Sequence, residues 1–326
     1  MRIDCQTHVF PKAYAELLLK NTTPVRTVRK GDAYVVAYGD LQTFALSLDP
    51  YDPDRKIRDM DAAGIDVSVL TVNIPGPELL THELGIEGAR ICNDYLAELC
   101  IRYSGRFVGL ATLPLQDVGA AMAEYQRAIH DLGLRGIFLF SHVAGKPLDA
   151  PEFEPLYAAA ERDQIPLVLH PTVPTWGEVV KDYSMIPMVG LMMDTSIAML
   201  RLILSGTLER HPNLLIVHPH CGGVLPYLMP RVEEQTEVKR RGREHIRKPP
   251  GEYYRTVYLD IVSPSAQAMQ YAYEFSRPDR LLFGSDHPWV KIGAILEHFD
   301  RLAIPAERKA MILGENAKRL FRIGEG

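Results

Sequence analysis

Short runs of apolar, mostly β-branched residues alternate with longer stretches of helical periodicity along nearly the whole chain. Such runs favour strands, whereas apolar residues spaced three and four apart favour helices. The predicted strands are residues 2–9, 67–72, 107–112, 136–140, 167–170, 214–218, 256–261 and 280–284. The predicted helices are residues 52–63, 85–103, 118–132, 152–163, 187–210, 224–241, 265–275 and 293–302. This alternation is typical of parallel strands joined by helical crossovers.

The number of predicted strands favours one parallel architecture over another. Eight strands alternating with helices are the pattern of a (β/α)8 TIM barrel. A doubly wound open sheet is the alternative, but the sequence has no glycine-rich turn after residues 2–9. We therefore predict that residues 1–326 form a single α/β barrel domain.

One segment, residues 25–46, interrupts the alternation. Two apolar runs there flank Lys30-Gly31-Asp32, a pattern that favours a β-hairpin. We predict a small β-hairpin insertion after the first strand, covering the mouth of the barrel. The helical pattern resumes at Asp52-Pro53, where proline occupies the first turn and its missing N–H costs least.

Composition and charge exclude several classes of protein. The 326 residues are 47% hydrophobic, and 36 lysines and arginines oppose 41 aspartates and glutamates, as in ordinary soluble domains. The one short basic cluster, residues 239–243, is too small for a nucleic-acid interface. We expect no membrane partner, since no apolar run approaches the roughly 20 residues of a spanning helix. The four cysteines form no CxxC pair, which suits a cytoplasmic protein.

Polar residues follow four of the predicted strands. The catalytic groups of β/α barrels lie at such carboxyl ends, so these residues are expected to meet at one rim. The four ends are Asp4-Cys5-Gln6-Thr7-His8, His170-Pro171, His218-Pro219-His220-Cys221-Gly222-Gly223 and Gly284-Ser285-Asp286-His287-Pro288. Any one histidine here is more often a hydrogen-bonded structural residue, but the coincidence of four ends favours a functional site.

The residue types at this rim suit a divalent metal. Gln6 and His8 are two positions apart, so in a strand both side chains point to the same face, which we expect to be the inward one. A catalytic metal needs three nitrogen or oxygen ligands and an open position, which His8, His170 and Asp286 supply.

Three motifs also resemble a known family. They are Ile3-Asp4-Cys5-Gln6-Thr7-His8-Val9-Phe10-Pro11, His220-Cys221-Gly222-Gly223 and Gly284-Ser285-Asp286-His287-Pro288. They resemble patterns of the amidohydrolase superfamily, in the branch of aminocarboxymuconate-semialdehyde decarboxylase, namely Ile-Asp-x-His-x-His-x-x-Pro, His-Gly-Gly-Gly and Gly-Ser-Asp-Tyr-Pro. Gln6 departs from the first pattern, because it stands where the family has a histidine.

The resemblance implies a role for each rim residue. His8, His170 and Asp286 become metal ligands, and Gln6 occupies the position of a further ligand. His220 becomes a catalytic residue beside the metal, with His218 the competing candidate. We expect Zn²⁺ first. Mn²⁺ is the second choice, because the amide oxygen of Gln6 is a harder donor than imidazole and suits a harder ion.

The resemblance also implies how an acidic substrate is held. Arg231 matches an arginine that reaches the substrate from a neighbouring subunit, which implies a homodimer. Lys56 falls in register with a carboxylate-binding arginine, and Arg55 precedes it. The sequence itself also offers aromatic and polar side chains able to line a pocket for the ring of a substrate. They are His287, Trp176 and Trp289.

These roles imply a metal-dependent non-oxidative decarboxylase of a small aromatic or muconate-like carboxylic acid. Either Asp286 or His220 returns the proton that replaces carbon dioxide. Two other interpretations remain open. The same barrel suits a hydrolase or hydratase of a lactone, an amide or a ring-cleavage product. A non-catalytic protein that binds small acids is the third, if Gln6 abolishes metal binding.

Overall fold

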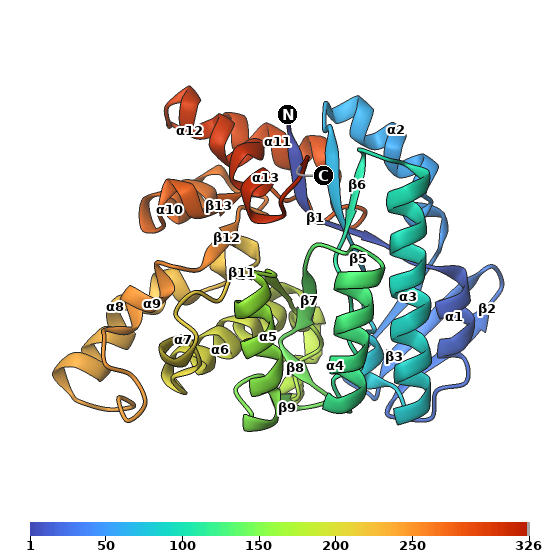
Figure 1. The fold of residues 1–326 in the computed structure, drawn as a ribbon, viewed down its shortest axis with the longest axis horizontal. Helices are drawn as coiled ribbons and strands as arrows, with labels where there is room; N and C mark the ends of the chain where they lie inside the picture. Colours follow the sequence, from blue (N-terminus) through green and yellow to red (C-terminus); the bar gives the residue numbers. More distant parts are fainter. Residues whose placement is uncertain (325–326) are drawn as a thin grey trace.

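Eight parallel strands form a closed barrel in the computed structural model, which describes residues 1–324 (Figure 1). They are β1 (Ile3–Val9), β5 (Val67–Val72), β6 (Phe107–Gly109), β7 (Ile137–Phe140), β10 (Leu167–His170), β11 (Ile216–His218), β12 (Tyr258–Asp260) and β13 (Leu281–Leu282). Parallel pairing runs β1-β5-β6 and β7-β10-β11-β12-β13. Two bridges, Ala111 to Ile137 and Thr7 to His287, join these sheets at both edges. The predicted barrel is confirmed.

Helices surround the strands, and most coincide with the predicted ones (Figure 1). The longer ones are α2 (Pro53–Ala63), α3 (His82–Arg102), α4 (Val118–Gln126), α5 (Glu154–Asp163), α6 (Leu191–Leu204), α8 (Leu225–Glu233), α10 (Ala266–Phe275) and α11 (Ile292–Asp300). The shorter ones are α1 (Lys12–Leu18), α7 (Thr207–Arg210), α9 (Pro250–Tyr254), α12 (Ala306–Ala310) and α13 (Asn316–Leu320). The start of α2 shows the expected capping, because Asp52 accepts the Arg55 N–H at 2.8 Å.

The barrel interior is filled by side chains from all of its strands. They include Ile3, Val69, Val108, Phe138, Val168, Val217, Tyr258 and Leu282. Leu320 and Phe321, at the end of α13, belong to the same buried cluster as Ile3 at the start of β1. The amino-terminal end of the barrel is therefore packed, and the carboxyl ends of the strands remain for chemistry.

The insertion at residues 25–46 is an antiparallel sheet of three strands rather than a hairpin. Its strands are β2 (Val25–Lys30), β3 (Ala33–Tyr38) and β4 (Gln42–Leu46). The predicted hairpin is present, with Gly31 at φ 62° in its turn, but β4 was missed because its residues are mostly half-exposed and only weakly apolar. Phe44 of β4 meets Trp289 edge-on at 6.1 Å between ring centroids. The sheet therefore lies against the loop that follows β13.

One helical stretch, Asp182–Leu204, is longer and more apolar than expected, because the sequence was expected to contain no run of the length of a membrane-spanning helix. Its mean hydropathy of 1.5 and its length would suffice to cross a membrane. Half of it is buried inside the protein, however, and it carries Asp194, which is only 6% exposed. These features are those of a core helix in this barrel. A separate short hairpin, β8 (His142–Val143) and β9 (Lys146–Pro147), follows β7.

Candidate active site

His8, His170 and Asp286 form a compact cluster at the carboxyl ends of β1, β10 and β13. Their ligand atoms all lie within 4.8 Å of one another. His8 Nε2 is 2.9 Å from Asp286 Oδ1, and His170 Nε2 is 4.0 Å from the same oxygen. The structure therefore brings together the three residues expected to hold a metal.

A register shift in β1 brings its polar residues into the barrel. Ile3 and Cys5 belong to the interior cluster, so strict alternation would point Gln6 and His8 outward. The pairing with β5 shifts between Asp4 and Thr7, where β1 has one more residue than its partner. This bulge reverses the alternation, so Gln6 and His8 also face inward.

Hydrogen bonds fix the tautomers of both histidines. The Thr71 hydroxyl donates to the Thr7 carbonyl at 3.2 Å, so its oxygen accepts from His8 Nδ1 at 2.7 Å. His170 Nδ1 donates to the Pro171 carbonyl at 2.8 Å. Each Nε2 therefore keeps a lone pair directed at Asp286, which is how histidine binds a cation.

Charges in the cluster also suit a cation. Burial lowers the pKa of His8 to about 4, which keeps the imidazole neutral. Burial works to raise the pKa of Asp286, but the neighbouring imidazole rings of His170, His220 and His8 hold it well below its usual range. Two neutral imidazoles and one carboxylate are a suitable ligand set for a divalent metal.

Gln6 lies at the edge of this cluster. Its Nε2 is 3.3 Å from Asp286 Oδ1 and 3.5 Å from His220 Nε2. Its Oε1 is buried and has no hydrogen-bond partner among residues 1–324. The amide nitrogen of Gln6 therefore faces the cluster, and a half-turn of the amide would direct its unpartnered oxygen there as a fourth metal ligand.

The two candidate histidines, His220 and His218, point to different surroundings. His220 Nε2 lies 3.9 Å from Asp286 Oδ2, and its backbone N–H donates to Asp260 Oδ1 at 2.7 Å. Burial works to lower the pKa of His220, but the hydrogen bond and charge of Asp286 raise it above its ordinary value. His218 instead contacts the Tyr254 hydroxyl at 2.7 Å, in the layer between barrel and helices. Of the two, His220 therefore lies beside the cluster.

The turn that carries Asp286 is held by a buried carboxylate that the sequence did not single out. Asp4 accepts the backbone N–H of Ser285 at 2.9 Å and its hydroxyl at 2.5 Å. The Asp286 N–H donates to the Gln6 carbonyl at 2.9 Å. These bonds fix Asp286 at φ 64°, a left-handed conformation uncommon for aspartate.

Lys56, His287 and Arg55 do not lie where direct substrate contact was expected. Lys56 is fully buried, with its Nζ 2.7 Å from His287 Nδ1, and His287 Nε2 is 3.0 Å from Asp59 Oδ2. The polar atoms of both side chains are thus bonded to other protein groups, next to the turn that carries Asp286. Arg55 is at the surface and pairs with Asp49. Its position in the exposed first turn of α2 keeps it from the cluster.

Of the other predicted contacts, Trp289 lies in the loop after β13, against the inserted sheet. It is 50% exposed and packs against Phe44 of the inserted sheet. Trp176 donates from Nε1 to Asp194 at 3.0 Å. Arg231 is exposed on α8, and the structure of this single chain does not bring it to the cluster.

Two aromatic walls were missed by sequence reasoning. The Phe138 ring lies 5.0 Å from that of His170 and 6.1 Å from that of His8, and the Phe140 ring lies 5.9 Å from that of His170. In the sequence both residues look like ordinary core positions of β7, and their place next to His170 depends on the pairing of β7 with β10.

A closed β/α barrel that carries two histidines and an aspartate at the carboxyl ends of its strands is typical of barrel proteins with a metal centre. The model of the amidohydrolase family matches residues 3–323, and the chain belongs to this family. The resemblance found in its motifs is thereby confirmed.

Several similar proteins are decarboxylases. The gamma-resorcylate decarboxylase of Rhizobium radiobacter is 32% identical over 284 residues, which are 83% of this chain and 87% of that protein. The 2-amino-3-carboxymuconate-6-semialdehyde decarboxylase of Dictyostelium discoideum is 28% identical over 246 residues, which are 73% of this chain and 67% of that protein. The crystal structure of 5-carboxyvanillate decarboxylase from Sphingomonas paucimobilis is 28% identical and covers 99% of each chain, with a TM-score of 0.86.

Proposed function

We propose that this protein is a metal-dependent non-oxidative decarboxylase of a small aromatic carboxylic acid. The observation that carries the proposal is the cluster of His8, His170 and Asp286, whose ligand atoms lie within 4.8 Å of one another. The three similar proteins described above support it, because each acts by decarboxylation on a small unsaturated acid.

The ligand set supports a single divalent metal. The resemblance favoured zinc first, but the unpartnered Oε1 of Gln6 adds an oxygen to the set. Oxygen ligands favour manganese relative to zinc. We therefore propose Mn²⁺ as the working metal, with Zn²⁺ as the metal to compare.

The residues divide the chemistry among them. When bound, the cation supplies a positive charge that holds the oxygens of the acid and stabilises the negative charge that develops as carbon dioxide leaves. Cleavage of the carbon–carbon bond leaves an electron pair on the ring carbon, which must take up a proton. His220 Nε2 and Asp286 Oδ2, 3.9 Å apart, are the two groups able to hold that proton at the site. Phe138 and Phe140, next to His170, exclude water from the aromatic ring of the substrate.

We also propose a cytoplasmic homodimer. Val179, Tyr183 and Met188 are large apolar side chains between 68% and 87% exposed, in the segment before α6. Tyr227 is 77% exposed on α8, the helix that carries Arg231. A second copy that covers these residues supports a shared site. Sedimentation of the wild type and of Tyr183→Ser tests this, and a monomeric wild type would exclude it.

The decisive experiment is release of labelled carbon dioxide from carboxyl-labelled 2,6-dihydroxybenzoate and 2-hydroxybenzoate by the Mn²⁺-loaded protein. We expect His220→Asn to lose activity while it keeps its metal, and His8→Ala to lose both. His82→Asn, at the exposed start of α3, is the control. Turnover of a lactone or amide without carbon dioxide would instead support the hydrolase. Binding without turnover or metal would support the small-acid binding protein.

A further inference from the structure

The ring of His220 is held differently from the rings of the two histidine ligands. Nδ1 of His8 and Nδ1 of His170 each have a hydrogen-bond partner, which fixes the plane of the ring. Nδ1 of His220 is buried and has no partner among residues 1–324. Its Nε2 lies 3.5 Å from Gln6 Nε2 and 3.9 Å from Asp286 Oδ2, and both distances are too long for a strong hydrogen bond. The position of this ring must therefore come from the backbone that carries it.

The backbone of His220 belongs to a left-handed turn. The residues from His220 to Gly223 have φ of 54°, 57°, 77° and 60° in succession. Glycine tolerates such values, but histidine and cysteine rarely adopt them. A Cβ atom at Gly222 would lie 2.4 Å from the Tyr254 hydroxyl, so the turn has little room to shift. A conformation of this kind persists only where the surrounding structure holds it.

Asp260, the last residue of β12, bonds the first residue of this turn. Its Oδ1 accepts the backbone N–H of His220 at 2.7 Å and that of Val262 at 3.1 Å. The residue is 1% exposed, so water does not compete for these bonds. Burial raises the pKa of Asp260 to about 6, although His220 and both N–H groups work to lower it. Near neutral pH the group is therefore mostly a carboxylate, which forms stronger hydrogen bonds than a neutral acceptor.

Asp260 also lies between the two groups that are able to hold the proton. Its strand, β12, pairs with β11, which leads to His220, and with β13, which leads to Asp286. A Cβ atom at Gly284 would lie 3.4 Å from that of Asp260 and 3.1 Å from that of Gln6. The chain just before Asp286 thus packs closely against Asp260. One buried side chain therefore contacts the segments that carry both proton-holding groups.

We propose that Asp260 is a positioning residue, which places His220 Nε2 next to Asp286 through the backbone N–H of His220. The proposal rests on the proposed decarboxylase function, in which these two groups hold the proton that replaces carbon dioxide. The role requires no contact between Asp260 and the substrate. Loss of the carboxylate should therefore slow the chemical step and leave binding of the metal and of the acid nearly unchanged.

Steady-state kinetics of the Mn²⁺-loaded protein with 2,6-dihydroxybenzoate test the proposal. We expect Asp260→Ala to lower kcat at least 100-fold, with KM and the affinity for Mn²⁺ changed less than three-fold. Asp260→Asn keeps an oxygen that accepts both N–H groups, so its kcat should lie within ten-fold of the wild type. A loss of Mn²⁺ affinity as large as the loss of kcat would show a general disturbance of the rim, and would overturn the proposal.

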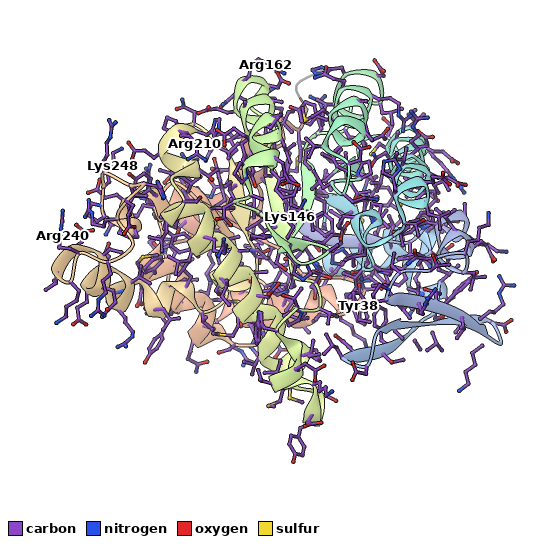
Figure 2. All side chains as sticks on the ribbon, turned by 90° about the horizontal axis from the view of Figure 1, so that it is seen from below. Tyr38, Lys146, Arg162, Arg210, Arg240 and Lys248 are labelled. Atoms are coloured by element: carbon purple, nitrogen blue, oxygen red, sulfur yellow. The ribbon has the colours of Figure 1, made fainter. Side chains whose placement is uncertain are left out.

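Glu161→Ala is the matched control, because Glu161 also accepts a backbone N–H, that of Asn213 at 2.8 Å. Its neighbour in the chain is Arg162, which Figure 2 shows at the upper edge of the molecule, on the side away from Tyr38 and the inserted sheet. The control should lower the melting temperature and leave kcat unchanged. An equal fall of kcat in Glu161→Ala would mean that lost stability alone explains the effect of Asp260→Ala, which would also exclude the positioning role.

Imidazole nitrogen NMR spectra give a measurement that needs no turnover. In the Zn²⁺-loaded protein, which is diamagnetic, the signals of His220 are identified by their loss in His220→Asn. We expect Asp260→Ala to shift these signals and to leave those of His8 and His170 in place. Unchanged His220 signals, or a kcat within three-fold of the wild type, would contradict the proposal.

Two further outcomes are distinguishable. If Asp260→Ala does not fold, Asp260→Ser decides by the same criteria, because its short side chain does not reach the N–H of His220. If the wild type releases no carbon dioxide, the decarboxylase function fails. The NMR spectra then still show whether Asp260 fixes the position of His220.

Discussion

Nζ of Lys56 lies 2.7 Å from Nδ1 of His287, the residue that follows Asp286. His287 Nε2 donates to Asp59 at 3.0 Å, so Nδ1 of a neutral ring accepts from Lys56. Burial lowers the pKa of His287 to about 4, so the ring stays neutral in this chain. Lys56 thus supports the turn that carries Asp286 from behind, and its amine is not free to bind a substrate.

Replacement of Lys56 by methionine should destabilise the protein. Methionine keeps most of the volume but removes the donor, which leaves His287 Nδ1 buried and unpaired. We expect the free energy of unfolding in urea to fall by about 1–3 kcal/mol. Lys12→Met, at the exposed start of α1, is the matched control and should change it by less than about 0.5 kcal/mol. Equal stability of Lys56→Met and wild type would show that the contact is unimportant.

The position of Lys56 marks the limit of the sequence argument. Its charge and its register in the α2 segment favoured a substrate contact, but whether a lysine side chain points into a pocket or behind it depends on packing. The ligands were easier to predict, because the carboxyl ends of parallel strands always meet at one rim. His8, His170 and Asp286 needed only the strand boundaries.

Other features could not be predicted because they depend on partners distant in the chain. The bulge in β1 exists only in the pairing with β5, so the correct inward direction of Gln6 and His8 was reached without it. The third strand of the insertion has too few buried residues to show a clear pattern. Glu78 reads as a surface residue of a proline-rich turn, and only the fold shows that it is buried.

Loss of the Thr71 hydroxyl should weaken metal binding. The hydroxyl accepts from His8 Nδ1 at 2.7 Å and so directs the Nε2 lone pair toward Asp286. We expect Thr71→Val to bind Mn²⁺ roughly 10–100-fold more weakly, measured by calorimetry. Thr71→Ser should restore most of the affinity.

Thr43→Val is the control for this experiment, because Thr43 is exposed in the middle of β4. Its Mn²⁺ affinity should match the wild type. If Thr71→Val also matched it, the tautomer of His8 would not depend on Thr71.

Substitution of Gln6 should change metal affinity in both directions. Glutamate places a charged oxygen where Gln6 Oε1 is unpartnered, so Gln6→Glu should bind Mn²⁺ at least ten-fold more tightly. Gln6→Leu removes the oxygen and should bind it more weakly. Competition with a chelator of known affinity measures both variants. Identical affinities of Gln6→Leu and wild type would mean that Gln6 is not a ligand.

The stability of the protein should carry a pH dependence that comes from Glu78. Burial raises its pKa from 4.5 to about 8, so between these values the folded protein keeps a proton that the unfolded chain has lost. Its contribution to stability therefore falls as pH rises through this window. Urea unfolding should show wild type losing up to about 4 kcal/mol relative to Glu78→Gln between pH 5 and pH 8. Parallel curves for the two proteins would mean that Glu78 is already ionised in the folded protein, and that burial of its carboxylate is offset by neighbouring groups.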